Sequence, residues 1–74
     1  MSTALTSAQS GVLAFVRQYR RENQMPPTRA EIAQYFGWVS ANSAEQHLQA
    51  LASKGVIRLQ PGRPRGIFDL QEVS

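Results

Sequence analysis

The sequence predicts a small, mainly α-helical domain in which three helices precede a short β-hairpin. Helix-start signals stand at Thr6 and Thr28, where a hydroxyl residue precedes Gln or Glu by three positions. Apolar residues then recur at helical spacing as far as residue 52, and the spacing becomes strand-like after Gly55. The 74 residues leave room for one domain only.

The first helix is expected over about residues 7–23. Thr6 and Gln9 form a capping box, in which each side chain satisfies a backbone N–H at the helix start. One apolar stripe follows, made of Val12, Phe15, Val16 and Tyr19. The segment Gln24-Met25-Pro26-Pro27 cannot continue a helix, because proline lacks the N–H and disfavours helix at the preceding residue.

The second helix is expected over about residues 28–36. A second capping box, Thr28 with Glu31, opens it, and Gly37 suits the left-handed position that closes it. Its apolar side chains are Ile32, Ala33 and Phe36. A tight turn through Trp38 then leads to the next helix, and we interpret Trp38 as an anchor in the core or turn.

The third helix is expected over about residues 41–54, closed by Gly55. Ser40 can cap it, although Asn42 with Glu45 is an alternative cap two residues later. Its apolar face comprises Ala44, Leu48, Leu51 and Ala52. His47 lies beside this face and is interpreted as a packing or capping histidine.

The hairpin is expected over about residues 56–70, around a loop at 61–65 that holds two prolines and a glycine. A two-stranded ribbon is marginal alone, so it should pack on the helices through Ile57, Leu59, Phe68 and Leu70. The predicted order is thus helix, helix-turn-helix and two-stranded wing, a three-helix winged helix-turn-helix domain.

Composition favours a polyanionic partner. Eight Lys and Arg against five Asp and Glu give a net charge of +3. Nucleic acid is the first choice and an anionic membrane the second, but the basic residues do not lie opposite a wide apolar face on one helix, which argues against the membrane. Neither a signal peptide nor a membrane span is evident, so a soluble, cytoplasmic protein is expected.

Catalysis, metals and cofactors are not expected. There is no cysteine and only one histidine, so neither a thiolate site nor a His-rich metal site can be built. Scattered Ser and Asp with one His do not assemble a nucleophile, a base and an orienting acid. The competing function of another class is a winged-helix protein-interaction module that regulates another protein.

The candidate DNA-reading residues lie near the start of the third helix, which is of a size to enter the major groove. Asn42 and Gln46 can pair with adenine, and Glu45 can accept from the cytosine amino group. Each has an alternative role as a cap or an exposed helix residue. The predicted base contacts are Ser40, Asn42, Ser43, Glu45 and Gln46.

Candidate phosphate contacts lie around the helix-turn-helix and in the wing, because such contacts position a protein on DNA without reading its sequence. Arg63 and Arg65 are expected at the hairpin tip, where they could straddle the backbone or enter a minor groove, or simply lie in a solvated loop. The predicted set is Thr28, Arg29, Lys54, Arg63 and Arg65.

The sequence resembles the N-terminal DNA-binding domain of the LexA repressor family. The resemblance rests on Met25-Pro26-Pro27-Thr28-Arg29-Ala30-Glu31-Ile32-Ala33-Gln34, then on Ser40, Asn42, Ala44-Glu45, His47-Leu48, Ala50-Leu51-Ala52, Lys54-Gly55-Val56-Ile57 and Arg65-Gly66-Ile67. It implies a repressor of bacterial DNA-damage (SOS) genes that binds palindromes of CTG/CAG-type half-sites. Ser40, Asn42 and Glu45 match base-contacting positions of that family.

The resemblance also shows departures. Ser43 stands where the family usually has alanine and Gln46 where it has a second glutamate, so the half-site preference is open at these positions. Pro61, Arg63 and Pro64 differ from the family and suggest a stiffer, more basic wing tip.

Members of the LexA family carry a C-terminal domain that dimerises and cleaves its own linker, and the sequence lacks its Ser/Lys pair. The chain is therefore expected to be either an excised fragment or a small regulator that does not release DNA by self-cleavage. A monomer is expected in free solution, with a second copy joining it on a palindromic site.

Overall fold

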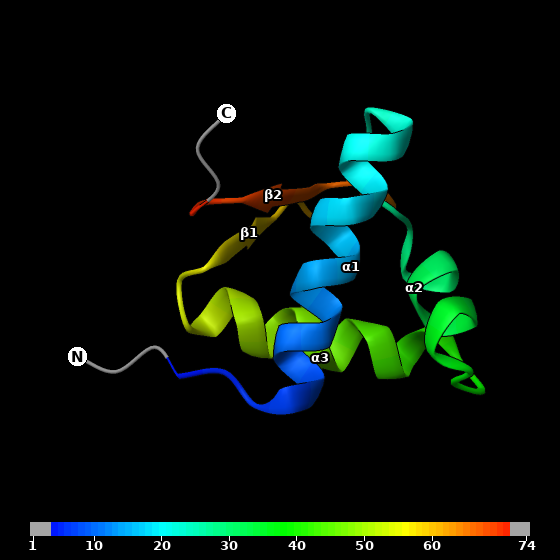
Figure 1. Cartoon of the computed structure of the whole chain (residues 1–74), viewed down its shortest axis with the longest axis horizontal. Coiled ribbons are helices and arrows are strands. Elements are labelled where there is room, and N and C mark those ends of the chain that lie inside the picture. The colour runs from blue at the N-terminus through cyan, green and yellow to red at the C-terminus, as the bar shows by residue number, and fades with distance from the viewer. Residues whose placement is uncertain (1–3, 72–74) are drawn as a thin grey trace.

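The structure, a computed structural model, describes residues 4–71 and contains three helices followed by an antiparallel hairpin (Figure 1). The elements are α1 (Ser7–Asn23), α2 (Arg29–Phe36), α3 (Ala41–Ser53), β1 (Ile57–Leu59) and β2 (Ile67–Asp69). The predicted fold class is confirmed. The helix bounds differ from the prediction by one residue at the start of α2 and at the end of α3.

Both predicted capping boxes are present. At α1 the Gln9 N–H donates to the Thr6 hydroxyl, and the Thr6 N–H donates to the Gln9 side chain, each over 3.1 Å. At α2 the Glu31 N–H donates to the Thr28 hydroxyl over 3.1 Å, and the Thr28 N–H donates to Glu31 over 2.8 Å. These local hydrogen bonds set where α1 and α2 begin.

The start of α3 differs from both caps that the sequence suggested. Ser40 occupies the N-cap position, but its side chain makes no capping hydrogen bond. The alternative cap, Asn42 with Glu45, is not formed either, because the Glu45 carboxylate binds Arg29 and Gln49. The Glu45 carboxylate, which the local sequence suggested as part of a helix cap, is thus used for side-chain contacts instead.

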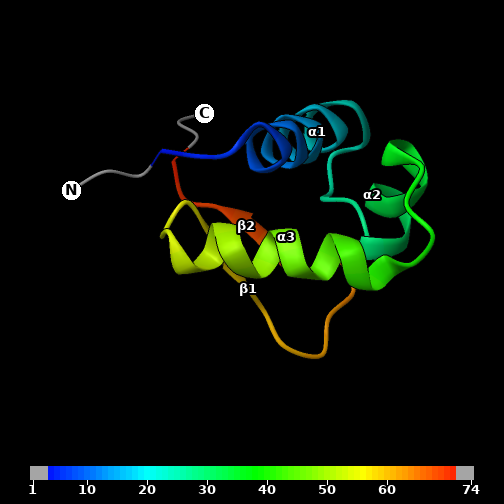
Figure 2. The same ribbon diagram turned by 90° about the horizontal axis from the view of Figure 1, so that it is seen from below.

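The core forms where α1, α2 and the hairpin pack on one face of α3. Figure 2 shows α1 on one side of α3 and the loop between β1 and β2 projecting past α3 on the other side. Leu13 belongs to this core although the predicted stripe on α1 omitted it, whereas Phe15 and Tyr19 are only half-buried. The buried hydrophobic residues that form this core are Val12, Leu13, Val16, Ile32, Ala33, Ala44, Leu48, Leu51, Val56, Ile57 and Ile67.

Aromatic rings connect the edge of this core to the helix-turn-helix. Trp38 stacks on Phe36 at 4.8 Å between ring centroids and on His47 at 4.6 Å. His47 Nδ1 also donates to the Ser43 carbonyl oxygen over 2.8 Å. The packing roles predicted for Trp38 and His47 are therefore confirmed.

The second strand of the hairpin turns the opposite face to the core from the one expected. Burial confirms Ile57 and Leu59, but the inward placement of Phe68 and Leu70 is wrong: Ile67 is 2% exposed, whereas Phe68 is 36% and Leu70 56% exposed. Leu59 pairs with Ile67, which leaves Phe68 on the outer face beside Arg58. A shift of one residue exchanges the two faces of a strand.

This register gives a stability prediction for the hairpin. We expect Ile67→Ala to lower the free energy of unfolding by about 2–5 kcal/mol, because it removes a fully packed side chain. Leu70→Ala, at a mostly exposed position, should cost less than about 1 kcal/mol. Urea denaturation followed by circular dichroism measures both. Equal losses of stability for the two variants would contradict the observed register.

Candidate nucleic-acid interface

The outer face of α3 carries polar side chains at helical spacing. Asn42 and Gln46 are exposed, and Glu45 and Gln49 lie one turn apart on the side toward the wing. Ser40 is exposed just before the helix, whereas Ser43 is half-buried and its carbonyl binds His47. The predicted reading residues are thus brought together on α3, with Ser43 at the margin.

An open groove separates this face from the wing, the segment from β1 through β2. It has a volume of about 470 Å³ and is lined by Arg29, Glu45, Gln49 and residues 59–64. The wing loop projects on the side of α3 opposite to α1 (Figure 2). One surface therefore combines the exposed face of α3 with the basic loop that holds Arg63.

Arg29 lies at the wall of this groove and contacts both sides of it. Its Nε donates to Glu45 Oε1 over 2.7 Å. Its Nη1 approaches the carbonyl oxygens of Arg63 at 3.4 Å and Pro64 at 3.1 Å. Hydrogen bonds from Gln49 and then Arg29 hold the pKa of Glu45 below its ordinary value.

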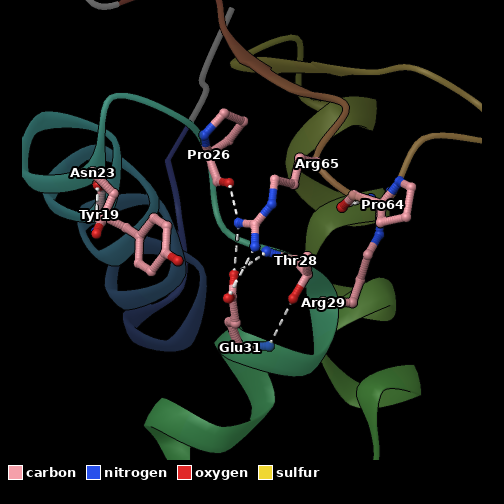
Figure 3. A network of polar contacts seen from close by, with 8 residues as sticks. All are labelled: Tyr19, Asn23, Pro26, Thr28, Arg29, Glu31, Pro64 and Arg65. Atoms are coloured by element: carbon pink, nitrogen blue, oxygen red, sulfur yellow. Dashed lines mark hydrogen bonds and ion pairs between the residues drawn. The ribbon is translucent and has the colours of Figure 1, made fainter.

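Arg65 lies at the base of the wing rather than at its tip. It donates to both carboxylate oxygens of Glu31, over 2.8 and 3.1 Å, and to the Pro26 carbonyl over 3.0 Å (Figure 3). Arg65 thereby joins the wing to the start of α2 and to the loop before it. Of the two arginines expected at the hairpin tip, only Arg63 lies in the exposed part of the loop.

Glu31 joins the start of α2 and the wing in one cluster with Thr28 and Arg65. The Arg65 hydrogen bonds, followed by the Thr28 backbone N–H, lower the pKa of Glu31 from 4.5 to about 2. Its carboxylate therefore serves at once as the α2 cap and as the acceptor for the wing. Thr28, predicted to contact phosphate, uses its hydroxyl oxygen to accept the Glu31 N–H.

Lys54 lies at the opposite end of α3 from the reading residues. Asn42 and Lys54 are 12 residues apart along α3, or about 18 Å at 1.5 Å per residue. Lys54 Nζ donates to the Ala4 carbonyl over 2.8 Å and to Gln9 Oε1 over 2.6 Å. In this structure Lys54 thus ties the end of α3 to the segment before α1.

Gln49 also lines the groove, although the sequence did not single it out. Its amide donates to Glu45 Oε2, so both oxygens of that carboxylate have a protein partner. The signal was present in the sequence, because residues four apart on a helix are neighbours and Gln pairs with acidic side chains at that spacing.

Within residues 4–71, no helix is long and apolar enough to cross a membrane. The same part of the chain holds no group of three or more His, Cys, Asp or Glu side chains that could bind a metal ion.

A helix-turn-helix with a polar second helix beside a basic two-stranded wing defines the winged helix-turn-helix class of DNA-binding domains. Comparison with known families agrees with this class, because residues 2–66 match the LexA DNA binding domain. The chain belongs to the LexA DNA-binding domain family.

Several full-length relatives are similar to this chain. The LexA repressor of Tolumonas auensis is 59% identical over 63 residues, which cover 85% of this chain and 31% of the relative. The LexA repressor of Aeromonas hydrophila is 57% identical over 68 residues, or 92% of this chain and 33% of the relative. The LexA repressor of Cellvibrio japonicus is 56% identical over 63 residues, or 85% and 32%. The chain thus spans about a third of the length of these relatives.

The Glu31 cluster gives a prediction for acid stability. Because the pKa of Glu31 is lower in the folded protein, its carboxylate stabilises the fold above about pH 4.5, and this contribution is lost as pH falls toward 2. We expect Glu31→Gln to be less stable than the parent at pH 6, with the difference shrinking toward pH 2.5. Urea denaturation at several pH values measures it, and a difference independent of pH would contradict the ionic role of Glu31.

Proposed function

We propose that this protein is a sequence-specific, double-stranded DNA-binding transcriptional repressor of the LexA type. The observation that carries the proposal is the exposed polar face of α3 beside the basic wing loop, with a groove between them. In this arrangement α3 enters the major groove while the wing lies along the sugar-phosphate backbone.

Base reading is assigned to the first two turns of α3. Asn42 can pair through its amide with adenine N6 and N7, and Gln46 offers the same groups one turn later. Glu45 can accept a hydrogen bond from the cytosine N4 amino group. Ser40 and Ser43 add hydroxyls at the edges of this face. The proposed targets are palindromes of CTG/CAG-type half-sites that control DNA-damage genes.

Phosphate binding is assigned first to Arg63, because its side chain lies on the exposed loop next to the groove. The Thr28 hydroxyl can still donate to a phosphate while accepting the Glu31 N–H. Lys54, Arg29 and Arg65 already bind other parts of the chain. Glu45 and Glu31 compensate the charges of Arg29 and Arg65, whereas Lys54 binds uncharged oxygens and its charge adds to the positive field that attracts DNA.

Palindromic targets imply two copies of the domain on one site. Each copy would read one half-site, and binding of the first raises the effective concentration of the second. We propose a monomer in free solution that pairs on DNA.

The test is fluorescence-anisotropy binding to a labelled CTG/CAG palindrome and to a scrambled duplex, for the parent and for Asn42→Ala. The parent should prefer the palindrome. Asn42→Ala should lose about 1–3 kcal/mol on the palindrome and little on the scrambled duplex, because a base contact carries the preference. Gln18→Ala, an exposed amide on α1, serves as the matched control.

The outcomes separate the proposed function from its rivals. Equal binding of both duplexes by the parent would contradict sequence-specific reading. Equal weakening on both duplexes for Asn42→Ala would remove its base contact. Absence of binding at low salt would instead favour a winged-helix module with a protein partner.

Arg63 gives a separate prediction about salt. We expect Arg63→Ala to weaken binding to palindrome and scrambled duplex alike, because a phosphate contact carries no sequence information. The slope of log affinity against log salt should become shallower by about 0.9 for each phosphate that the variant no longer neutralises. An unchanged slope, measured by anisotropy over a series of salt concentrations, would exclude Arg63 from the phosphate-binding residues.

A further inference from the structure

Arg29 has an environment that differs from that of a free phosphate-binding side chain. Its side chain is 19% exposed, and the Glu45 side chain that it binds is 34% exposed. Arg29 Nε binds one carboxylate oxygen, and the Gln49 amide binds the other. With both oxygens held, the carboxylate has one orientation relative to α3 before any DNA arrives.

The same guanidinium reaches the wing. Arg29 Nη1 approaches the carbonyl oxygens of Arg63 and Pro64, which lie 34 and 35 residues further along the chain. Arg29 itself is the first residue of α2. One side chain therefore joins α2, α3 and the wing loop on the two sides of the groove.

From these contacts we infer that Arg29 is a positioning residue for DNA reading: it fixes the Glu45 carboxylate for its base, and the wing carbonyls hold its guanidinium in the orientation that does so. The inference rests on the proposed function. It replaces the direct phosphate contact that the sequence predicted for Arg29 with a role exerted through Glu45.

Electrostatics give a reason for this arrangement. A lone carboxylate on the reading helix would be repelled by the DNA phosphates, and a paired one carries its compensating charge with it. Each carboxylate oxygen has two acceptor positions, so Glu45 can keep Arg29 and Gln49 while accepting one cytosine N4–H. Pairing with Arg29 thus compensates the negative charge of Glu45 near the DNA phosphates and leaves its carboxylate able to accept a hydrogen bond from a base.

Arginine suits this position better than lysine. The planar guanidinium presents Nε toward Glu45 and Nη1 toward the wing carbonyls in one rigid group. A lysine ammonium is a single point donor on a flexible stem and cannot span both partners in this geometry. Arg29→Lys therefore keeps the positive charge but loses the simultaneous contact with Glu45 and the wing carbonyls.

The experiment is a double-mutant cycle on DNA binding with Arg29→Met, Glu45→Gln and the double variant. Arg29→Lys tests the shape of the group, and Arg20→Met, an exposed arginine on α1, controls for the loss of one charge. Anisotropy with the palindrome and the scrambled duplex is measured at several salt concentrations. Carboxyl NMR titration of Glu45 without DNA reports directly on the contact between Arg29 and Glu45.

We expect Arg29→Met to weaken palindrome binding about tenfold, and scrambled binding no more than Arg20→Met does. Its salt slope should match that of Arg20→Met. The double variant should bind the palindrome no more weakly than Glu45→Gln alone, because Arg29 acts through Glu45. Arg29→Lys should recover only part of the affinity, and the pKa of Glu45 should rise in Arg29→Met.

Several results would overturn the inference. Equal weakening on both duplexes with a slope shallower by about 0.9 would make Arg29 a phosphate-binding residue, acting through its Nη2 group. Additive effects in the cycle, or an unchanged pKa of Glu45, would show that Arg29 does not act through that carboxylate. If Arg29→Met fails to fold, the same cycle with Arg29→Lys in its place tests whether Arg29 acts through Glu45.

The parent protein separates this inference from the proposed function. A parent without palindrome preference would overturn the proposed function, and the reading role of Arg29 with it. A parent that prefers the palindrome, together with an Arg29→Met variant that keeps the full preference, would overturn the inference alone.

Discussion

Burial of the apolar side of α3 is the constraint on which the rest of the structure depends. Ala44, Leu48 and Leu51 are completely buried, and the other elements contribute the residues that cover them. Because a helix buried on one side must leave its other side to solvent, packing this face also determines which residues are presented outward. The exposed polar face of α3 is thus fixed by the core beneath it, and a rotation of α3 would disturb both.

Ion pairs connect segments that the core alone does not align. Arg17 binds Asp69 and joins α1 to β2, and Arg65 binds Glu31 and joins the wing base to α2. The Asp69 side chain is almost fully buried, so replacing Arg17 would remove a positive charge that compensates a buried carboxylate and would destabilise the fold. Solvent screens the more exposed pair of Arg65 with Glu31 more strongly, so this pair contributes less stability than its distance alone would suggest. Its main effect is geometric, since it sets where the wing lies relative to the helices.

Local sequence determined the elements well and the long-range contacts poorly. The capping boxes at Thr6 and Thr28 predicted the starts of α1 and α2 because all their partners lie within three residues. The predicted inward placement of Phe68 was wrong, because alternation along one strand does not say which of its two faces meets the core.

The candidate site shows the same division. Helical spacing predicted which residues share the outer face of α3, and the structure agrees for Asn42, Glu45 and Gln46. Four basic residues, Arg29, Lys54, Arg63 and Arg65, were assigned to phosphate. Three of them, Arg29, Lys54 and Arg65, instead bind groups 16 to 50 residues away. Such partners depend on tertiary packing, which spacing along the chain does not encode.

Trp38, stacked between Phe36 and His47, is the single tryptophan of the chain and lies at the turn between α2 and α3. Its rings touch one neighbour from each of these helices, so a change in their relative orientation alters the surroundings of the indole directly. The protein therefore contains its own optical reporter at the helix-turn-helix, and intrinsic fluorescence can follow motion of α3 without an attached dye.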